Sequence, residues 1–178
     1  TDLSQNIEDS DLVKKQYIYF PNGDSLKVKK KSLRRKLYLS YFENTSNDTT
    51  LNWLKYGIQS AISTDLSQDK YIDAWTFSKW SIEQEKKPYK YGDKVSFFIY
   101  RQIARKNKIP YFIEGSFDKI NDDFVVTTRF CITKTGKRLD KRIFKNNDLF
   151  NLIDEISVSI KEDLGFSNNH IANIEDLP

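Results

Sequence analysis

The sequence is poor in the residues that most often bind metals or form covalent cross-links. It has one cysteine and one histidine, Cys131 and His170, and no methionine. A single cysteine excludes an internal disulfide, and the separation of Cys131 from His170 argues against a zinc site or a Cys–His nucleophile. We therefore expect Cys131 to be a small, at least half-buried residue of a strand.

Long apolar runs and glycine-rich loops are also missing. No run approaches the roughly 20 apolar residues that a membrane-spanning helix needs, and no signal peptide is visible. The six glycines form no phosphate-binding loop. Because the chain starts without Met and ends at Glu-Asp-Leu-Pro, we expect a mature chain or a piece of a longer protein.

What the chain does contain suits a folded domain. It has 178 residues, of which 38% are hydrophobic and 14% aromatic. A chain of this length can bury about 70% of its unfolded surface. We expect one α/β domain at residues 36–166, preceded by an arm and basic β-hairpin at 1–35 and followed by a linker at 167–178.

The positive charge is concentrated in one stretch. Residues 27–36, KVKKKSLRRK, hold seven of the 29 basic residues and no acid, whereas the rest of the chain carries 22 basic and 25 acidic residues. Such a block is typical either of a solvated strand edge protected by lysines or of a contact with phosphate or anionic lipid. The candidate contact residues for a partner or an anion are Lys27, Lys29, Lys30, Lys31, Arg34 and Arg35.

Periodicity predicts a mixed sheet with helices on both faces. Alternating residues around Pro-Asn-Gly-Asp predict the hairpin at 16–30. Two helical crossovers favour parallel pairing of the first three strands of the domain, and two short turns require antiparallel pairing of the last three. The expected strands are 36–42, 70–77, 109–117, 124–133 and 138–144, and the expected helices are 49–66, 93–106 and 148–164.

Several details of these elements are also predicted. Asp48 should cap the first helix, and Gly57 should allow that helix to approach the sheet closely. In the second helix Val95, Phe98, Ile99, Gln102 and Ile103 should face inward, and Asn107 should take the left-handed position after it.

The polar stretch Asn-Thr-Ser-Asn-Asp at 44–48 raises a choice between a ligand loop and a capped turn. Ligands of open α/β sheets bind outside the carboxyl ends of the strands. The same side chains, however, are those that bond to the backbone in a strand-to-helix turn, and we favour the turn.

Glu114-Gly115 indicates a bulge or a close backbone approach, with Glu114 paired to Arg129. No acid–base couple is evident, and the aromatic residues Trp80, Tyr89, Tyr91 and Phe97 near Lys86, Lys87 and Lys90 could stack on bases or only on their own loop.

Three segments resemble the amino-terminal domain of TolB and its CsgG-type and FlgO-type relatives, most of all the TolB-like domains that precede tetratricopeptide arrays. They are YFENTSNDTTLNWLKYGIQSAISTDLSQ, RQIARKNKIPYFIEGSF and RFCITKTGKRLDKRIFKNNDLFNLIDEISVSIKEDL. The positions that carry the likeness are Phe42, Asn44, Ser46, Asp48, Trp53, Gly57, Leu66, Ala104, Tyr111, Glu114, Gly115, Ser116, Thr135, Gly136, Phe150, Glu155 and Ile156. The sequence departs from the pattern at Leu39-Ser40-Tyr41, where Val-Leu-Pro is usual, and at Asn107, where Gly is common.

The resemblance covers residues 36–165 and implies a three-layer α/β/α domain. Its five-stranded mixed sheet would have the order 2-1-3-4-5 with strand 4 antiparallel, and the N-terminal β-hairpin would be an extension. It also implies a non-enzymatic module without cofactors, which acts in protein contact, sensing or assembly in the periplasm or cell envelope. Partners would be other proteins, the chain's own tetratricopeptide region or further copies, with any membrane anchor outside this chain. A cytoplasmic location, and a nucleotide- or nucleic-acid-binding module that uses residues 27–36, are the alternatives.

Overall fold

A computed structural model divides the chain into two compact units, Thr1–Arg35 and Lys36–Pro178. The first unit contains the predicted hairpin, because β1 (Lys15–Tyr19) pairs antiparallel with β2 (Ser25–Lys29). The structure describes residues 15–19, 25–29, 34–77, 94–168 and 171.

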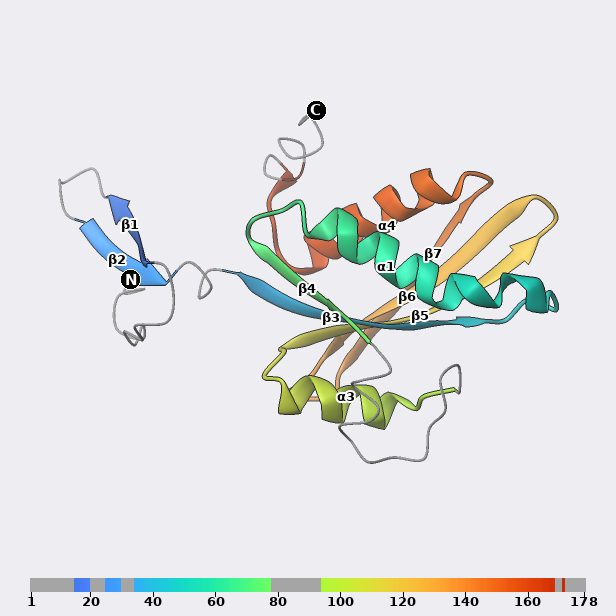
Figure 1. Ribbon diagram of the computed structural model, residues 1–178, viewed down its shortest axis with the longest axis horizontal. Coiled ribbons are helices and arrows are strands. Elements are labelled where there is room, and N and C mark those ends of the chain that lie inside the picture. Colours follow the sequence, from blue (N-terminus) through green and yellow to red (C-terminus); the bar gives the residue numbers. More distant parts are fainter. Residues whose placement is uncertain (1–14, 20–24, 30–33, 78–93, 169–170, 172–178) are drawn as a thin grey trace. The chain divides into compact units, whose positions relative to one another are not determined.

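The second unit is built on a five-stranded sheet with the order β4-β3-β5-β6-β7 (Figure 1). β3 and β5 are parallel, and β6 is antiparallel to both β5 and β7. This is the predicted order 2-1-3-4-5 with an antiparallel fourth strand. The strands are β3 (Arg35–Asn44), β4 (Ile72–Thr76), β5 (Tyr111–Ile120), β6 (Asp123–Ile132) and β7 (Arg138–Asn146).

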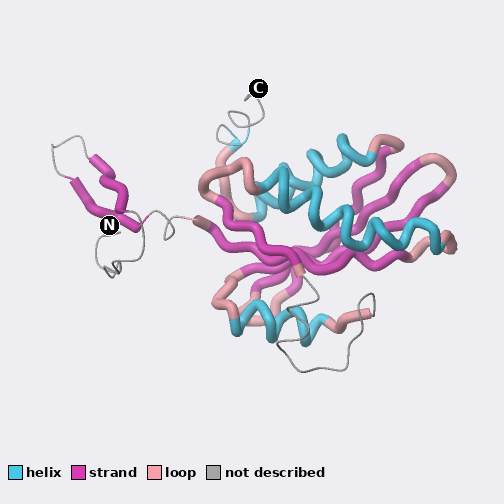
Figure 2. The backbone as a smooth tube through the Cα atoms, viewed as in Figure 1, coloured by secondary structure: helices cyan, strands magenta, loops and turns pink. Residues whose placement is uncertain are grey.

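Helices cover both faces of this sheet, as predicted (Figure 2). The helices α1 and α4 pack on one face over a core that includes Leu39, Phe42 and Phe117. The helix α3 packs on the other face over a more aromatic cluster. The helical elements are the 3-10 helix η2 (Thr49–Trp53), α1 (Leu54–Leu66), α3 (Phe97–Lys106) and α4 (Leu149–Asp163). Among the described residues no helix is both long and apolar enough to cross a bilayer.

The helix predicted at 93–106 is shorter than expected and turned about its axis. It begins at Phe97, and its buried residues are Ile99, Tyr100, Ile103 and Ala104. The prediction that Phe98 faces inward is wrong, because that side chain is 66% exposed. The buried aromatic residue is Tyr100, which packs edge-on against Phe77 with ring centroids 4.9 Å apart.

The residue with a left-handed backbone conformation after α3 lies one position later than predicted. Asn107 has a φ of −88° and its side chain donates to the Ile103 carbonyl, whereas Lys108 has a φ of 55°. The amide group of Asn107 thus bonds to the last turn of the helix, and the reversal falls on Lys108.

The predicted cap at Asp48 is confirmed, because its side chain accepts a hydrogen bond from the Thr50 N–H at 2.9 Å. Asp148 caps α4 in the same way by accepting a hydrogen bond from the Phe150 N–H at 2.8 Å. The explanation for Gly57 needs correction, because a Cβ there would lie 3.1 Å from the Trp53 ring and not against the sheet. Gly57 therefore makes room for an indole of its own helical segment.

Candidate functional site

A pocket of about 400 Å³ lies over residues 40–44 at the carboxyl end of β3 and residues 114–116 in the middle of β5. Its floor comes from β5 and β6, and one wall comes from residues 94–97 and Tyr100 at the start of α3. Open α/β sheets place their ligands outside the carboxyl ends of their strands, and the carboxyl end of β3 borders this pocket. The pocket is therefore the candidate site within the part of the chain that the structure describes.

A β-bulge in β3 shapes the pocket. Leu39 pairs with Ile113 and Phe42 pairs with Gly115, so three steps along β3 match two steps along β5. The extra residue sends Tyr41 to the α3 side of the sheet and Phe42 to the other side. Gly115 is the close approach expected from the sequence, because a Cβ there would lie 2.2 Å from the Phe42 ring.

The stretch 44–48 is a capped turn, as predicted. The Asn44 side chain donates to the Asp48 carbonyl at 3.0 Å and accepts from the Ser46 N–H at 3.0 Å, and the Thr45 hydroxyl donates to the Phe117 carbonyl at 2.9 Å. Hydrogen bonds from the Thr50 hydroxyl and then from the Thr50 N–H lower the pKa of the Asp48 carboxyl. Only Asn44 of this stretch lines the pocket.

Glu114 is held by Arg138 and not by Arg129. The two side chains form a two-pronged ion pair, in which Arg138 Nε lies 3.1 Å from one carboxylate oxygen and Nη2 lies 3.2 Å from the other. Arg129 stands opposite Glu114 in the strand register, as predicted, but forms no ion pair with it. The Arg138 guanidinium also lies 3.8 Å from the centre of the Phe97 ring, which fixes its position.

Cys131 is fully buried beneath this ion pair, in agreement with the prediction. Burial, followed by the nearby Glu114 carboxylate, raises the pKa of its thiol to about 12. Because a thiolate is the reactive form, Cys131 is a poor nucleophile at neutral pH.

The pocket has more positive than negative side chains. Its lining contains five basic residues and two acidic ones, Glu43 and Glu114. Lys94 pairs with Glu43 at 2.7 Å and Arg138 pairs with Glu114. The other three basic side chains have no carboxylate partner among the described residues, and they belong to Lys55, Arg129 and Lys141.

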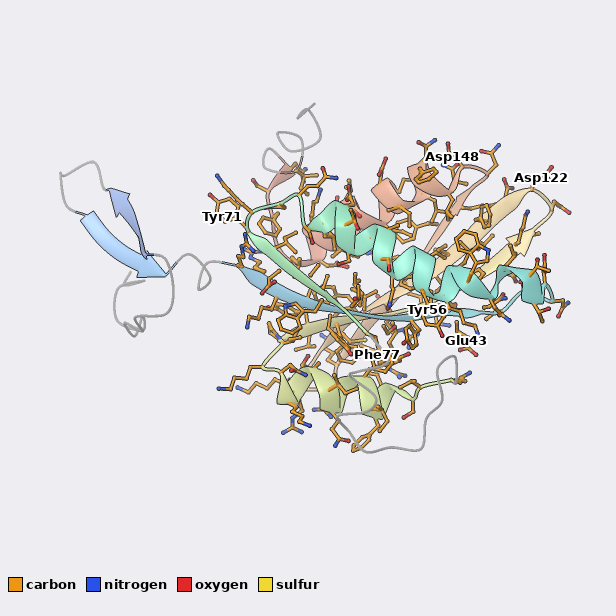
Figure 3. All side chains as sticks on the ribbon, viewed as in Figure 1. Glu43, Tyr56, Tyr71, Phe77, Asp122 and Asp148 are labelled. Carbon is orange, nitrogen blue, oxygen red and sulfur yellow. The ribbon has the colours of Figure 1, made fainter. Side chains whose placement is uncertain are left out.

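Aromatic rings form the inner wall. Tyr41 packs edge-on against both Tyr56 and Phe77, with ring centroids 4.6 Å apart in each pair. Figure 3 shows Tyr56, Phe77 and Glu43 where β3 passes between α1 and α3. Burial raises the pKa of Tyr100, the next ring in this wall, far above its ordinary value. The Tyr100 phenol is therefore a neutral packing group at physiological pH.

The basic residues proposed from the sequence belong to the first unit, Thr1–Arg35. Lys27 and Lys29 are on β2, where they stand opposite Tyr17 and Lys15, and Arg35 is the first residue of β3. Arg34 lies just before that strand, and Lys30 and Lys31 lie outside the described residues.

Most of the other candidates considered from the sequence lie outside the described residues, namely His170, Trp80, Tyr89, Tyr91 and the lysines 86, 87 and 90. In the turn between β5 and β6, Asp123 forms an ion pair with Lys145 at 3.0 Å. Within the described ranges no group of His, Cys, Asp and Glu could hold a metal ion.

Sequence reasoning missed Arg129, Lys141 and Lys55 as members of one site. Arg129 and Lys141 are register partners on β6 and β7. Counting back from the predicted turn at Thr135-Gly136 could have placed them near each other. Lys55 could not have been found this way, because it reaches the pocket from a helix on the other face of the sheet.

Comparisons with known proteins find similarity to solved structures at low sequence identity. No family model matches the chain, and no curated protein matches it. Among solved structures, the chain is similar to TolB from Acinetobacter baumannii, with 16% identity and a TM-score of 0.48 over 74% of this chain. The chain spans only 28% of that TolB.

Two smaller proteins are similar over most of their length. The LpoB C-terminal domain from Salmonella enterica has 13% identity and a TM-score of 0.48, covering 64% of this chain and 83% of that one. Lipoprotein GNA1162 from Neisseria meningitidis has 13% identity and a TM-score of 0.46, covering 74% of this chain and 97% of that one. Each of these identities is below 25% and each TM-score is below 0.5. We therefore infer neither the activity nor the partners of this chain from these proteins.

Proposed function

We propose that the chain is a non-enzymatic binding domain that acts in sensing or assembly through contact with a protein partner. The observation that carries this proposal is the state of the reactive groups around the pocket. Glu114 is engaged on both oxygens by Arg138, and the Cys131 thiol has a pKa of about 12. The Glu114 carboxylate is held in an ion pair and the neighbouring Cys131 thiol stays protonated at neutral pH. Such a pocket suits binding of a ligand and not its chemical conversion.

Exposed apolar side chains support the interaction role. Phe150 is 79% exposed, Ile143 69% and Trp53 62%. Aromatic residues of this size are the ones enriched in the centres of protein interfaces. β7 is an edge strand of the sheet, so an extended segment of a partner could also add to it.

Photo-crosslinking tests the interaction role. p-Benzoylphenylalanine placed at Phe150 in the full-length protein, in its own cells, should give an adduct of one discrete mass, whereas the same residue at Asp122 in the β5–β6 turn should give none. An adduct of twice the chain mass would indicate self-association, and another mass a different protein. Equal yields at the two positions would overturn the proposal.

We further propose an envelope location and a position before a tetratricopeptide array, in line with the sequence resemblance to TolB-like domains. Fractionation of cells and the complete reading frame test these two points. Recovery of the protein in the cytosolic fraction would contradict the envelope location. A reading frame without downstream helical repeats would contradict the position before a tetratricopeptide array.

A second candidate function is polyanion binding by the basic hairpin, at Lys27, Lys29, Lys30, Lys31, Arg34 and Arg35. It is favoured by the register of β1 and β2, which sets Lys15 opposite Lys29. Like charges directly opposite each other destabilise a strand pair, and a bound polyanion would relieve this. A steep loss of affinity for single-stranded nucleic acid with rising salt, abolished by K27Q/K29Q, would support it, and binding that is insensitive to salt would contradict it.

A further inference from the structure

We propose that the pocket beside the carboxyl end of β3 binds a small organic anion, with the anionic group held by Arg129, Lys141 and Lys55. The inference rests on the proposed function in one respect, namely that the pocket binds its ligand and leaves it unchanged. It adds a ligand class and a set of contact residues.

The first argument is the uncompensated charge on the pocket floor. Glu114, Arg129 and Lys141 stand in one row across β5, β6 and β7. The carboxylate at the end of this row is already engaged by Arg138. Arg129 and Lys141 therefore stand directly opposite each other, and neither has an ion-pair partner among the described residues. Like charges at such positions disfavour strand pairing, and an anion bound between them would offset this.

The second argument is the orientation of the Arg129 side chain. Its Nε is buried and has no hydrogen-bond partner among the described residues. Buried N–H groups are almost always paired in folded proteins. The pocket that Arg129 lines is a space in which an oxyanion could accept this bond, and the planar guanidinium suits a carboxylate or a phosphate.

The third argument comes from the start of α3. Ser96 precedes the helix and lines the pocket with Phe97, but the Ser96 side chain makes no capping bond. The first N–H groups of a helix carry partial positive charge and favour anions. Two strands, a helix start and Lys55 of α1 thus direct positive charge into the same cavity.

The size and walls of the cavity define the rest of the ligand. A volume of about 400 Å³ is within the range of small-molecule sites. Tyr41, Tyr100 and Phe97 supply aromatic surface beside the cations. The ligand class is therefore a compact organic anion, either a phosphate ester or a polycarboxylate, with an apolar part.

A titration of the full chain at constant ionic strength tests the proposal. The probes are phenyl phosphate, citrate, phenyl sulfate and inorganic phosphate. Binding of each probe is measured from the amide chemical shifts of the ¹⁵N-labelled protein. Saturable binding of phenyl phosphate or citrate should shift the Gly115 and Ser116 amides, and the stronger of the two identifies the source of the oxyanion. Phenyl sulfate, with a single charge, should bind more weakly.

Charge variants locate the site. R129Q should weaken binding at least about tenfold, since a charge-assisted hydrogen bond is lost, and K141Q should weaken it by about threefold or more. K134Q, which removes the same charge from the exposed β6–β7 turn, should change affinity less than about twofold. If R129Q does not fold, K141Q and K55Q carry the test because their side chains are not fully buried.

Two results would overturn the inference. One is the absence of saturable binding by every probe, and the other is an equal loss of affinity in K134Q and K141Q, which would indicate a general charge effect. Hydrolysis of phenyl phosphate, seen by ³¹P NMR and lost in R129Q, would instead contradict the non-enzymatic function while leaving the site in place. Failure of anion binding leaves the crosslinking test of the interaction role untouched.

Discussion

Two glycines of the domain have opposite tolerance for a methyl group. At Gly115 a Cβ would lie 2.2 Å from the ring of Phe42, which is fully buried. At Gly57 it would lie 3.1 Å from the ring of Trp53, which is 62% exposed and can move. The difference lies in the freedom of the neighbouring ring and not in the glycine.

The first prediction follows from this contrast. G115A should lower the free energy of unfolding by about 1–3 kcal/mol, as overpacking of a core does, whereas G57A should leave it unchanged or raise it by up to about 1 kcal/mol through helix propensity. Urea unfolding measures both. In an F42L background the cost of G115A should shrink, and an unchanged cost there would show that the ring is not the cause.

The second prediction concerns Cys131. Since its folded pKa is raised to about 12 from an ordinary value of 9.0, the stability linked to this thiol is fully present below pH 9 and is lost as pH rises toward 12. The free energy of unfolding should therefore fall less steeply above pH 9 in C131A than in the parent chain. The folded protein should also react with iodoacetamide at pH 8 far more slowly than in urea, and equal rates would contradict the buried position.

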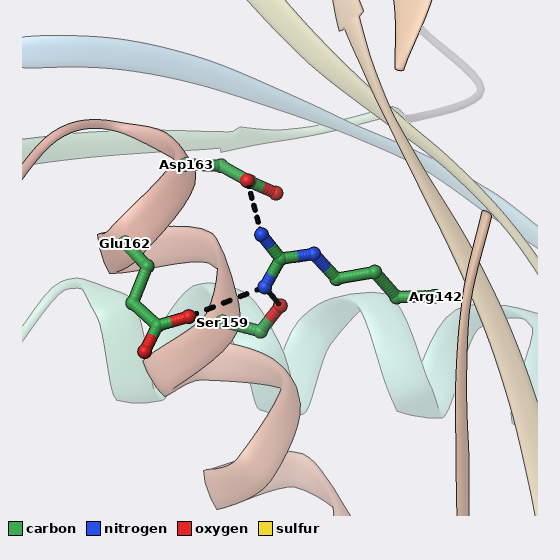
Figure 4. Close-up of polar contacts among 4 residues, drawn as sticks. All are labelled: Arg142, Ser159, Glu162 and Asp163. Carbon is green, nitrogen blue, oxygen red and sulfur yellow. Dashed lines mark hydrogen bonds and ion pairs between the residues drawn. The ribbon is translucent and has the colours of Figure 1, made fainter. Parts of the chain in front are cut away.

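At the scale of elements, Arg142 fastens the last helix to the edge strand. From β7 it donates to the Ser159 hydroxyl at 2.5 Å and pairs with Asp163 at 2.5 Å and Glu162 at 3.2 Å, all three on α4 (Figure 4). Burial raises the pKa of Asp163, and Arg142 opposes this rise. Without Arg142 the Asp163 carboxylate would be left half-buried without its cation.

The third prediction is that R142Q lowers the free energy of unfolding at pH 7 by about 1–2 kcal/mol, toward the low end for hydrogen bonds to charged groups because the Arg142 side chain is 40% exposed. The loss should shrink as the pH falls through the raised pKa of Asp163, because this carboxylate then takes up a proton and no longer needs the cation. R105Q, at an exposed position of α3, is the matched control and should show neither effect. A loss that is independent of pH would assign the role of Arg142 to packing alone.

The strands and α4 could be predicted because local rules and tertiary contacts agree there. Six successive buried residues in β3, Leu37 to Phe42, match the continuous apolar run of a strand covered on both faces. In α4 the apolar period, the Asp148 cap and Gly165 with its φ of 78° all mark the same helix.

The inward face of α3 could not be predicted in the same way. Apolar side chains occur on two different faces of the helix between Val95 and Ala104, so either face could point inward. The contact of Tyr100 with Phe77, which lies after β4, decides which face is buried. Such a contact leaves no trace in local periodicity.

The polar partners of the pocket depended on strand register. The predicted pairing of Glu114 with Arg129 follows from β5 and β6 alone. A register shift in the β6–β7 pair after Arg129 sets Arg138 opposite Cys131, whose sulfur lies 3.7 Å from the Glu114 carboxylate. A one-residue irregularity of this kind is not visible in composition or spacing, and it decides which cation Glu114 binds.

At the scale of the molecule, the two units differ in what stabilises each of them. Both hydrophobic core clusters consist of residues of Lys36–Pro178. The first unit has a two-stranded sheet of five-residue strands. An isolated two-stranded hairpin is marginally stable at best in water. The second unit should therefore hold the stability of the chain.

The last prediction follows from this difference. A chain of residues 34–178, which keeps all of β3, should unfold in one cooperative transition with a midpoint close to that of the full chain, since it keeps both core clusters of the described residues. Differential scanning calorimetry measures both chains. The peptide 1–33 alone should show no cooperative transition. A large drop in the midpoint of the shortened chain would mean that the first unit contributes to the stability of the second. An unchanged midpoint, together with loss of polyanion binding, would assign the hairpin a role in recognition.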